Sequence, residues 1–314
     1  MRKIVVASPN LSLDRTMQVD SLAIGHVHRS DRYEVRAGGK GVNVVRSLDA
    51  VGVTGVVIGF AGGRTGDAVE GLLQDEGLDA VIVRTPDETR SCLTVLSAEG
   101  VTVLNETGHP LPPDLWDDFE ASVETELEES ALFVCSGSFP PGAPDDAAAR
   151  LLKLAHGHAA TVICDTSRAQ LRAALAATPD VVVPNLPEAL DLLEGTTNEP
   201  VELSQGAAES GATAARALVD AGARTAIVTL GSAGAVSFWD GAARTWPPFS
   251  VQTLNPVGAG DSLVAGLAWG LAEGEPLARA TRRGLAMAAA SCESFVAGAV
   301  DEGRYRELLD SSAE

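Results

Sequence analysis

Short apolar runs rich in β-branched residues alternate with Ala- and Leu-rich stretches along most of the 314 residues. The runs predict strands at 4–7, 55–59, 80–84, 131–135, 161–164, 181–183 and 226–230. The stretches have helical periodicity and predict helices at 41–51, 67–76, 113–128, 145–156, 187–193, 207–221, 259–272 and 277–291. Strands this continuously apolar are typical of a parallel sheet with helices on both faces. The sequence therefore predicts an α/β fold with a mainly parallel sheet.

Two segments interrupt this alternation. Residues 15–37 alternate only loosely between apolar and polar residues, and residues 91–103 alternate around a Glu99-Gly100 turn. Both are predicted to be antiparallel strands outside the main sheet. They can form a small flap over a site or an ordinary edge extension of the sheet, and the pattern does not separate the two.

The composition limits the partners. Lys and Arg total 23 against 43 Asp and Glu, a formal charge of −20, which opposes binding to nucleic acid and to anionic membranes. A phosphorylated ligand remains compatible, because backbone amides and a few Arg side chains can hold it locally. No apolar run is long enough to span a membrane, and the first residues form a predicted strand rather than a signal peptide. Four widely spaced cysteines predict buried free thiols and a cytoplasmic protein.

A glycine-rich turn, Gly258-Ala259-Gly260-Asp261, opens one predicted helix. Glycines let the backbone approach an anion, and the first N–H groups of a helix are unpaired and partly positive. This arrangement suits the charge that develops on a phosphoryl group during transfer. Asp261 can take a proton from an attacking hydroxyl. The alternative is a simple turn in which Asp261 caps the helix.

Further clusters lie at comparable places. Residues Gly38–Arg46 join an extended segment to a helix, with Lys40 and Asn43 on the predicted ligand side. Asp14, after the first strand, can hydrogen-bond sugar hydroxyls. Residues Ser136–Gly142 follow the carboxyl end of a strand, where α/β sheets bind ligands.

Asn185 and Glu188 open another helix. They can hold hydrated Mg²⁺ near ATP phosphates, or they can form a capping box. The sequence has no Gly-x-x-x-x-Gly-Lys-Ser/Thr loop, and no Gly-x-Gly-x-x-Gly between strand and helix with an acidic partner, so P-loop and dinucleotide folds are not indicated.

In this order along the chain, the motifs resemble the ribokinase-like, phosphofructokinase B type carbohydrate kinases over essentially the whole length. The Gly38–Arg46 cluster and Leu254–Asp261 carry the resemblance, and Ser136–Gly142, Asn185–Glu188 and Thr229–Gly234 support it. The resemblance implies a single kinase domain over residues 1–314 with a ribokinase-like three-layer core and a small β-flap lid. The lid strands would come from about 15–37 and 91–103, and a homodimer would form through the lid.

The resemblance also implies the site. ATP and Mg²⁺ are the implied cofactors, and a monovalent cation is a further candidate. ATP would bind at Asn185 and at the Thr229, Gly231 and Gly234 loop, with Glu188 at the metal. The anion hole would be Gly258, Ala259 and Gly260, with Asp261 as catalytic base. The sugar would bind at Asp14, Gly39, Lys40, Asn43, Arg90 and Ser138.

Within the family, the chain looks most like the tagatose-6-phosphate kinase and 1-phosphofructokinase branch. Arg90 matches a position that holds the phosphate already on the substrate, and Lys40 and Ser138 match positions that assist it. Fructose 1-phosphate, fructose 6-phosphate and tagatose 6-phosphate are the implied substrates. A kinase for an unphosphorylated sugar or nucleoside, and a noncatalytic sensor on the same fold, remain alternatives.

Two positions depart from the pattern. Val183 stands where the branch usually has a lysine near the ATP phosphates, and Arg64 or Arg168 is a candidate replacement. Near the end of the first strand, the usual Asn-Pro is Pro9-Asn10, which predicts a different loop around Asp14.

Overall fold

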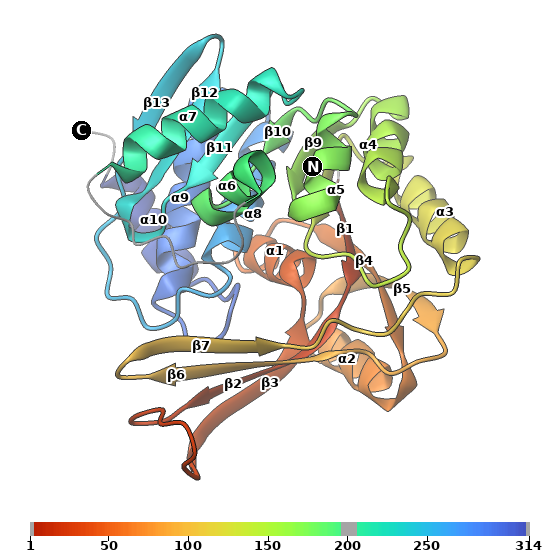
Figure 1. The fold of residues 1–314 in the computed structure, drawn as a ribbon, viewed down its shortest axis with the longest axis vertical. Helices are drawn as coiled ribbons and strands as arrows, with labels where there is room; N and C mark the ends of the chain where they lie inside the picture. The colour runs from red at the N-terminus through yellow and green to blue at the C-terminus, as the bar shows by residue number, and fades with distance from the viewer. Residues whose placement is uncertain (1–2, 196–205, 312–314) are drawn as a thin grey trace.

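The computed structural model describes residues 3–195 and 206–311. Its main sheet has nine strands in the order β13-β12-β11-β10-β9-β8-β1-β4-β5 (Figure 1). Neighbours from β5 to β11 pair in parallel, and β12 and β13 are antiparallel. The strands are β1 (Ile4–Asn10), β4 (Gly55–Gly62), β5 (Asp79–Thr85), β8 (Leu132–Ser136), β9 (Thr161–Asp165), β10 (Val181–Val182), β11 (Thr225–Thr229), β12 (Ala235–Trp239) and β13 (Ala242–Trp246). The predicted α/β fold with a mainly parallel sheet is confirmed.

Helices cover both faces of this sheet. Successive strand residues point to opposite faces, so Val5 joins one hydrophobic cluster and Val6 the other. The first cluster includes residues of α3 (Leu115–Leu127), α4 (Ala147–Gly157), α5 (Arg168–Leu175), α6 (Leu186–Glu194) and α7 (Ala207–Asp220). The second includes residues of α1 (Lys40–Asp49), α2 (Gly63–Asp75), α8 (Ala259–Ala272), α9 (Leu277–Cys292) and α10 (Glu302–Asp310). The core is therefore split into two layers by the sheet.

A separate four-stranded sheet forms the lid, in the order β3-β2-β6-β7, and projects from the body in Figure 1. Its strands are β2 (Ser12–Gln18), β3 (Arg32–Gly38), β6 (Ser91–Ser97) and β7 (Gly100–Asn105). The flap alternative is confirmed, but the two hairpins meet through the parallel pair β2–β6. Strand β2 begins shortly after the carboxyl end of β1, and β6 begins shortly after that of β5. Because β1 and β5 run in the same direction, β2 and β6 also run in the same direction.

One hairpin of two strands and two helices were not predicted. The β12–β13 hairpin turns at Asp240-Gly241, whose φ values of 52° and 73° are those of a tight hairpin turn, and this dipeptide is a recognisable hairpin signal. The short helices α5, of 8 residues, and α10, of 9 residues, were also not predicted.

The described helices include none long and apolar enough to cross a membrane. The four cysteines are free, and Cys92, Cys135 and Cys164 are buried, as predicted, whereas Cys292 is only partly buried.

Two glycines hold α8 against α9. A Cβ at Gly284 would lie 2.5 Å from the carbonyl oxygen of Leu263, and one at Gly266 would lie 2.8 Å from Cα of Gly284. Only glycine allows backbones to approach this closely. This contact fixes the position of α8, whose first turn carries Asp261.

Candidate active site

A large cavity lies at the carboxyl ends of β1, β8, β9 and β10, where parallel sheets bind ligands. Its volume is about 1310 Å³. It extends from Arg90 and Ser138 at one end to Asn185 and Glu188 at the other. The described structure thus brings the predicted residues Arg90, Ser138, Asn185 and Glu188 to one cavity. Among the described residues, Asp261, Lys40 and Asn43 do not line it.

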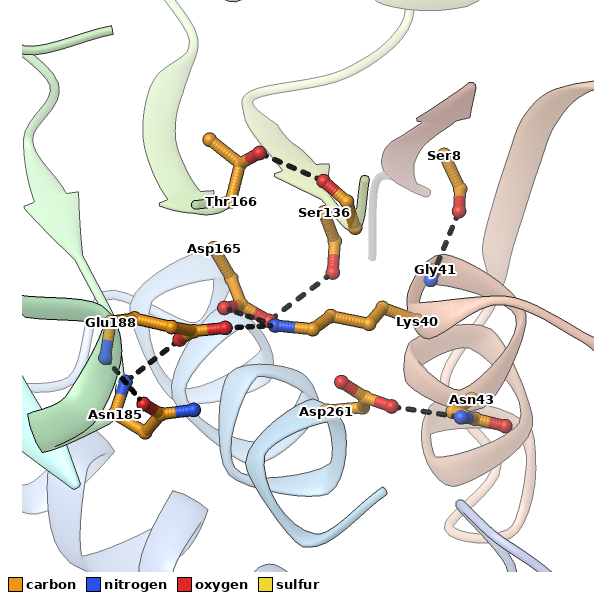
Figure 2. A network of polar contacts seen from close by, with 11 residues as sticks. Ser8, Lys40, Gly41, Asn43, Ser136, Asp165, Thr166, Asn185, Glu188 and Asp261 are labelled. Carbon is orange, nitrogen blue, oxygen red and sulfur yellow. Dashed lines mark hydrogen bonds and ion pairs between the residues drawn. The ribbon is translucent and has the colours of Figure 1, made fainter. Parts of the chain in front are cut away.

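Asp261 is the third residue of α8 and is only 5% exposed. Its Oδ2 atom accepts a hydrogen bond from Asn43 Nδ2 at 2.8 Å. Within the described chain, no side chain caps α8, because the capping position is Gly258 with φ of 84°. The alternative in which Asp261 caps the helix is therefore wrong, and its carboxylate points to α1 instead (Figure 2).

The glycines of this turn have different roles. A Cβ at Gly258 would lie 2.8 Å from the backbone nitrogen of Gly298, so this position needs glycine for packing as well as for its φ. A Cβ at Gly260 would meet none of the described atoms within 4 Å. The backbone at Gly260 therefore borders open space from which an anion can approach the start of α8, whereas the N–H group of Ala259 donates to the Pro256 carbonyl oxygen at 3.3 Å.

Lys40 lies among carboxylates from three other elements (Figure 2). Its Nζ atom is 3.0 Å from Asp165 Oδ1 and 3.6 Å from Glu188 Oε1. Burial disfavours the charge of Lys40, but Asp165, Glu188 and Asp261 outweigh it and raise the pKa of the ammonium group. Lys40 is therefore a fixed cation at the centre of the site.

Asp165 was not predicted as a site residue. It is the last residue of β9, is 3% exposed, and accepts a hydrogen bond from Ser136 Oγ at 3.4 Å. An acidic residue at the carboxyl end of a continuously apolar strand was the available signal, because burying a carboxylate there requires a partner or a ligand.

Burial raises the pKa of Asp261 to about 7, and repulsion from Asp165 and Glu188 adds to the effect. Lys40 and the Asn43 hydrogen bond act in the opposite direction. A carboxylate with this pKa can accept a proton near neutral pH, as a general base must.

Asn185 and Glu188 form the capping box that the sequence offered as an alternative. Asn185 Oδ1 accepts from the Glu188 backbone at 2.8 Å, and Glu188 Oε2 accepts from the Asn185 backbone at 3.0 Å. The other Glu188 oxygen faces Lys40, so capping leaves one carboxylate oxygen for the site. Asp165 and Glu188 are hard oxygen donors of the kind that bind Mg²⁺ together with phosphates and water, so they fit this ion. The described residues contain no cluster of three or more potential ligands that would form a metal site by themselves.

The far end of the cavity contains Arg90, which is held by backbone carbonyls. Its Nε and Nη2 atoms donate to Asn10 O at 3.2 and 3.0 Å, and Nη1 donates to Glu106 O at 3.1 Å. Asn10 Nδ2 in turn donates to Ser138 Oγ at 3.1 Å. Three of the five guanidinium N–H groups are engaged in the described structure, which leaves two for an anion in the cavity.

Asp14 lies at the base of the lid and accepts from Ser12 Oγ at 2.5 Å. Burial raises the pKa of Asp14, although Ser12 and Arg90 oppose the shift. A Cβ at Gly38 would overlap the Asp14 carboxylate, at 2.0 Å from Cγ, so glycine is required beside it. Gly39, with φ of 108°, then turns the chain into α1 and directs Lys40 inward.

The Thr229, Gly231 and Gly234 loop lies one strand further along the sheet. Thr229 forms a bridge with Asn185, and Gly231 and Gly234 have φ values of 56° and 91°. Among the described residues, these three do not line the large cavity.

Val183 is 3% exposed and packs in the hydrophobic core. Of the two candidate replacements for the usual lysine, Arg168 lines the cavity. Arg64 lies in α2 next to Glu88, and within the described chain it does not line the cavity.

Comparison with known proteins gives a consistent result. The model of the pfkB family carbohydrate kinases matches residues 4–302. Phosphofructokinase-2 from Escherichia coli, solved with potassium, is 28% identical over 100% of both chains, with a TM-score of 0.87. A possible 1-phosphofructokinase from Thermotoga maritima is 20% identical over 98% of this chain and 97% of its own, with a TM-score of 0.84. Ribokinase from the same organism is 19% identical over 99% and 100%, with a TM-score of 0.73. At these identities, the last two comparisons show that the chain shares their fold.

Proposed function

Because the chain belongs to the pfkB family of carbohydrate kinases, which are ATP-dependent phosphotransferases, we propose that it transfers the γ-phosphoryl group of ATP to a hydroxyl of a hexose phosphate. The observation that supports this most directly is the placement of Asp261. Its carboxylate is buried at the first turn of α8, and Asn43 holds one of its oxygens. Among the described residues, the other oxygen has no hydrogen-bond partner, so it can accept the proton of a sugar hydroxyl.

In this mechanism, the sugar hydroxyl attacks the γ-phosphorus in line with the leaving ADP oxygen while its proton passes to Asp261. The N–H groups of the first turn of α8, from Gly258 to Gly260, stabilise the negative charge on the transferred group. The ammonium group of Lys40, which interacts with the charges of Asp165, Glu188 and Asp261, adds positive charge. The lid excludes water, which would otherwise hydrolyse ATP.

We assign the ATP side of the site to Asn185, Thr229, Gly231 and Gly234. Asp165 and Glu188 would hold Mg²⁺, which neutralises charge on the ATP phosphates when bound. Phosphofructokinase-2 from Escherichia coli has been solved in complex with potassium, so a monovalent cation is part of the proposal. Replacing K⁺ by tetramethylammonium in the assay tests this part directly.

Arg90 supports a substrate that already carries a phosphate, with Ser138 and Asp14 binding the sugar. Within the described chain, two of the Arg90 N–H donors have no partner, and such donors are suited to a phosphate oxygen pair. The Escherichia coli relative has also been solved in complex with fructose-6-phosphate, and it is 27% identical to this chain in that structure. Fructose 1-phosphate, fructose 6-phosphate and tagatose 6-phosphate are the proposed substrates.

The test is ADP release from MgATP with fructose 1-phosphate, fructose 6-phosphate, tagatose 6-phosphate, fructose and ribose. We expect turnover with at least one hexose phosphate and little with the free sugars. Turnover with a free sugar or a nucleoside alone would contradict the substrate class. No turnover with any sugar or nucleoside, together with measurable binding, would favour a noncatalytic sensor.

We also propose that residues 1–314 act as one kinase domain that dimerises through the lid. Tyr33 and Leu104 are 56% and 60% exposed, and the strand register places them on the same face of the lid sheet. An exposed apolar face of this kind marks an interaction surface. L104E should shift the protein towards monomer in sedimentation velocity, whereas L193E, at an exposed leucine of α6, should not. A wild-type monomer would contradict this proposal.

A further inference from the structure

A line of buried contacts continues from Asp261 through Asn43 to an arginine without an assigned role. Asn43 uses its Nδ2 atom to hold Asp261, and its Oδ1 atom accepts a hydrogen bond from Arg46 Nη1 at 2.8 Å. Arg46 is 8% exposed and lies about one helical turn after Asn43 in α1. It is therefore inside the molecule, behind the residue that holds the base.

The guanidinium group of Arg46 is fully engaged. Nε and Nη2 donate to the two carboxylate oxygens of Glu76 at 2.7 and 3.2 Å. Nη2 also donates to Ala37 O at 2.7 Å, and Nη1 donates to Ala297 O at 3.2 Å. With the bond to Asn43, these contacts use all five N–H groups, so the group has a single favourable orientation.

This arrangement determines which end of the Asn43 amide faces Asp261. An arginine can only donate hydrogen bonds, so it must face the oxygen of the amide. The NH₂ group is then directed to Asp261, where it favours the ionised carboxylate. If the amide were turned by half a rotation, its oxygen would face Asp261 and would favour the protonated acid, which cannot act as a base.

We propose that Arg46, anchored by Glu76, is a positioning residue for phosphoryl transfer: it fixes the Asn43 amide so that Asp261 stays ionised and oriented towards the sugar hydroxyl. This inference rests on the proposed role of Asp261 as base. In the described part of the chain, Arg46 is linked to Asp261 through the Asn43 amide, and Glu76 is linked through Arg46, so both act through Asn43.

Other charged groups also lie around Asp261 and Arg46. Asp261 faces Lys40 from α1, Asp165 from β9 and Glu188 from α6. Behind Arg46, Arg36 Nη1 of β3 lies 3.9 Å from Glu76 Oε1. Changing Arg46 leaves Lys40, Asp165 and Glu188 in place, so a shift in the titration of Asp261 reports on the Asn43 contact.

The test compares R46K and E76Q with wild type. A lysine cannot reach Glu76 and Asn43 together in the arginine geometry. We expect kcat of R46K to fall about 10- to 100-fold, as is typical for groups that orient a reactive residue, with KM for ATP unchanged. The acidic limb of the kcat profile should move up by about one pH unit, because a hydrogen bond to the carboxylate is lost or reversed. E76Q should show a smaller change in the same direction.

A matched control is R283K. Arg283 is also a buried arginine paired with a glutamate, Glu275, but its guanidinium group lies over Trp269, towards the end of α8 opposite to Asp261. R283K should lower thermal stability and leave the pH profile unchanged. If Arg46 had a purely structural role, R46K would likewise lower thermal stability and leave the pH profile unchanged.

A double-mutant cycle with N43A completes the test. If Arg46 acts through Asn43, R46K should add little to the loss already caused by N43A. An unchanged acidic limb in folded R46K, or independent effects of R46K and N43A, would overturn the inference; if R46K does not fold, E76Q is judged by the same two criteria. High activity in D261N would instead contradict the proposed function itself, so the two failures are distinguishable.

Discussion

Asn43 Nδ2 lies 2.8 Å from Asp261 Oδ2, and this bond joins residues that are 218 positions apart in the sequence. Each residue follows a glycine-rich segment at the start of a helix: Asn43 is the fourth residue of α1, and Asp261 is the third residue of α8. The two sequence motifs that appear unrelated along the chain therefore form one site, in which one helix start orients the carboxylate of the other.

The raised pKa of Asp261 predicts the pH dependence of the reaction. A base must be ionised, and burial raises the pKa of this carboxyl to about 7, so kcat should fall as the pH drops through about 7. The measurement is kcat with saturating sugar phosphate and MgATP between about pH 5 and 9. An acidic limb near pH 4, the ordinary range of a carboxyl group, would show that Asp261 is not the titrating base.

Arg90 should determine the preference for a phosphorylated sugar. R90A should raise KM for the sugar phosphate by about 10- to 100-fold, because hydrogen bonds to a charged group contribute about 1.5–3 kcal/mol. KM for ATP should stay unchanged. The control is R84A, since Arg84 is an exposed arginine of β5 that pairs with Asp67. Equal effects of R90A on sugar phosphate and on ATP would argue against a specific phosphate contact.

Arg168 is the better placed of the two candidates for the role of the missing lysine. It lines the cavity, where Asn185 and Glu188 also lie. We expect R168A to raise KM for ATP by about tenfold, the effect of losing one charge-assisted hydrogen bond. R64A is the comparison and should leave KM for ATP unchanged. An R168A enzyme with wild-type KM for ATP and wild-type turnover would remove this role.

The contact between α8 and α9 should be sensitive to a single methyl group. G284A should destabilise the protein by about 1–3 kcal/mol, because the added Cβ would overlap the Leu263 carbonyl oxygen. G71A provides the control, since Gly71 lies in α2 and a Cβ there would meet none of the described atoms within 4 Å. That change should stabilise by about 0.5–1 kcal/mol. Urea unfolding measures both, and equal effects would contradict the close packing.

Much of this fold is encoded in local patterns. Strands such as Val5–Ala7 and Val56–Ile58 are apolar on both faces, and the start of α8 at Ala259 follows its glycine. The sequence predicted antiparallel strands outside the main sheet, but not the parallel pairing of β2 with β6, since pairing between distant strands leaves no mark in either segment.

The candidate site, like the fold, was only partly predictable from the sequence. Asp261, Lys40 and Asn43 were identified because they accompany glycine turns. Asp165 and the function inferred for Arg46 were not, because their roles depend on long-range contacts such as Lys40–Asp165. A buried charge is explained only when the partners that the fold brings to it are known.

The most direct test is the turnover of D261N with the sugar phosphate that wild type uses best. Asparagine preserves the size of the side chain but cannot accept the proton. We predict that kcat falls by about 10²- to 10⁴-fold, while sugar phosphate and ATP still bind and the protein remains folded. A folded D261N protein with near-normal turnover would contradict the central claim that Asp261 is the catalytic base.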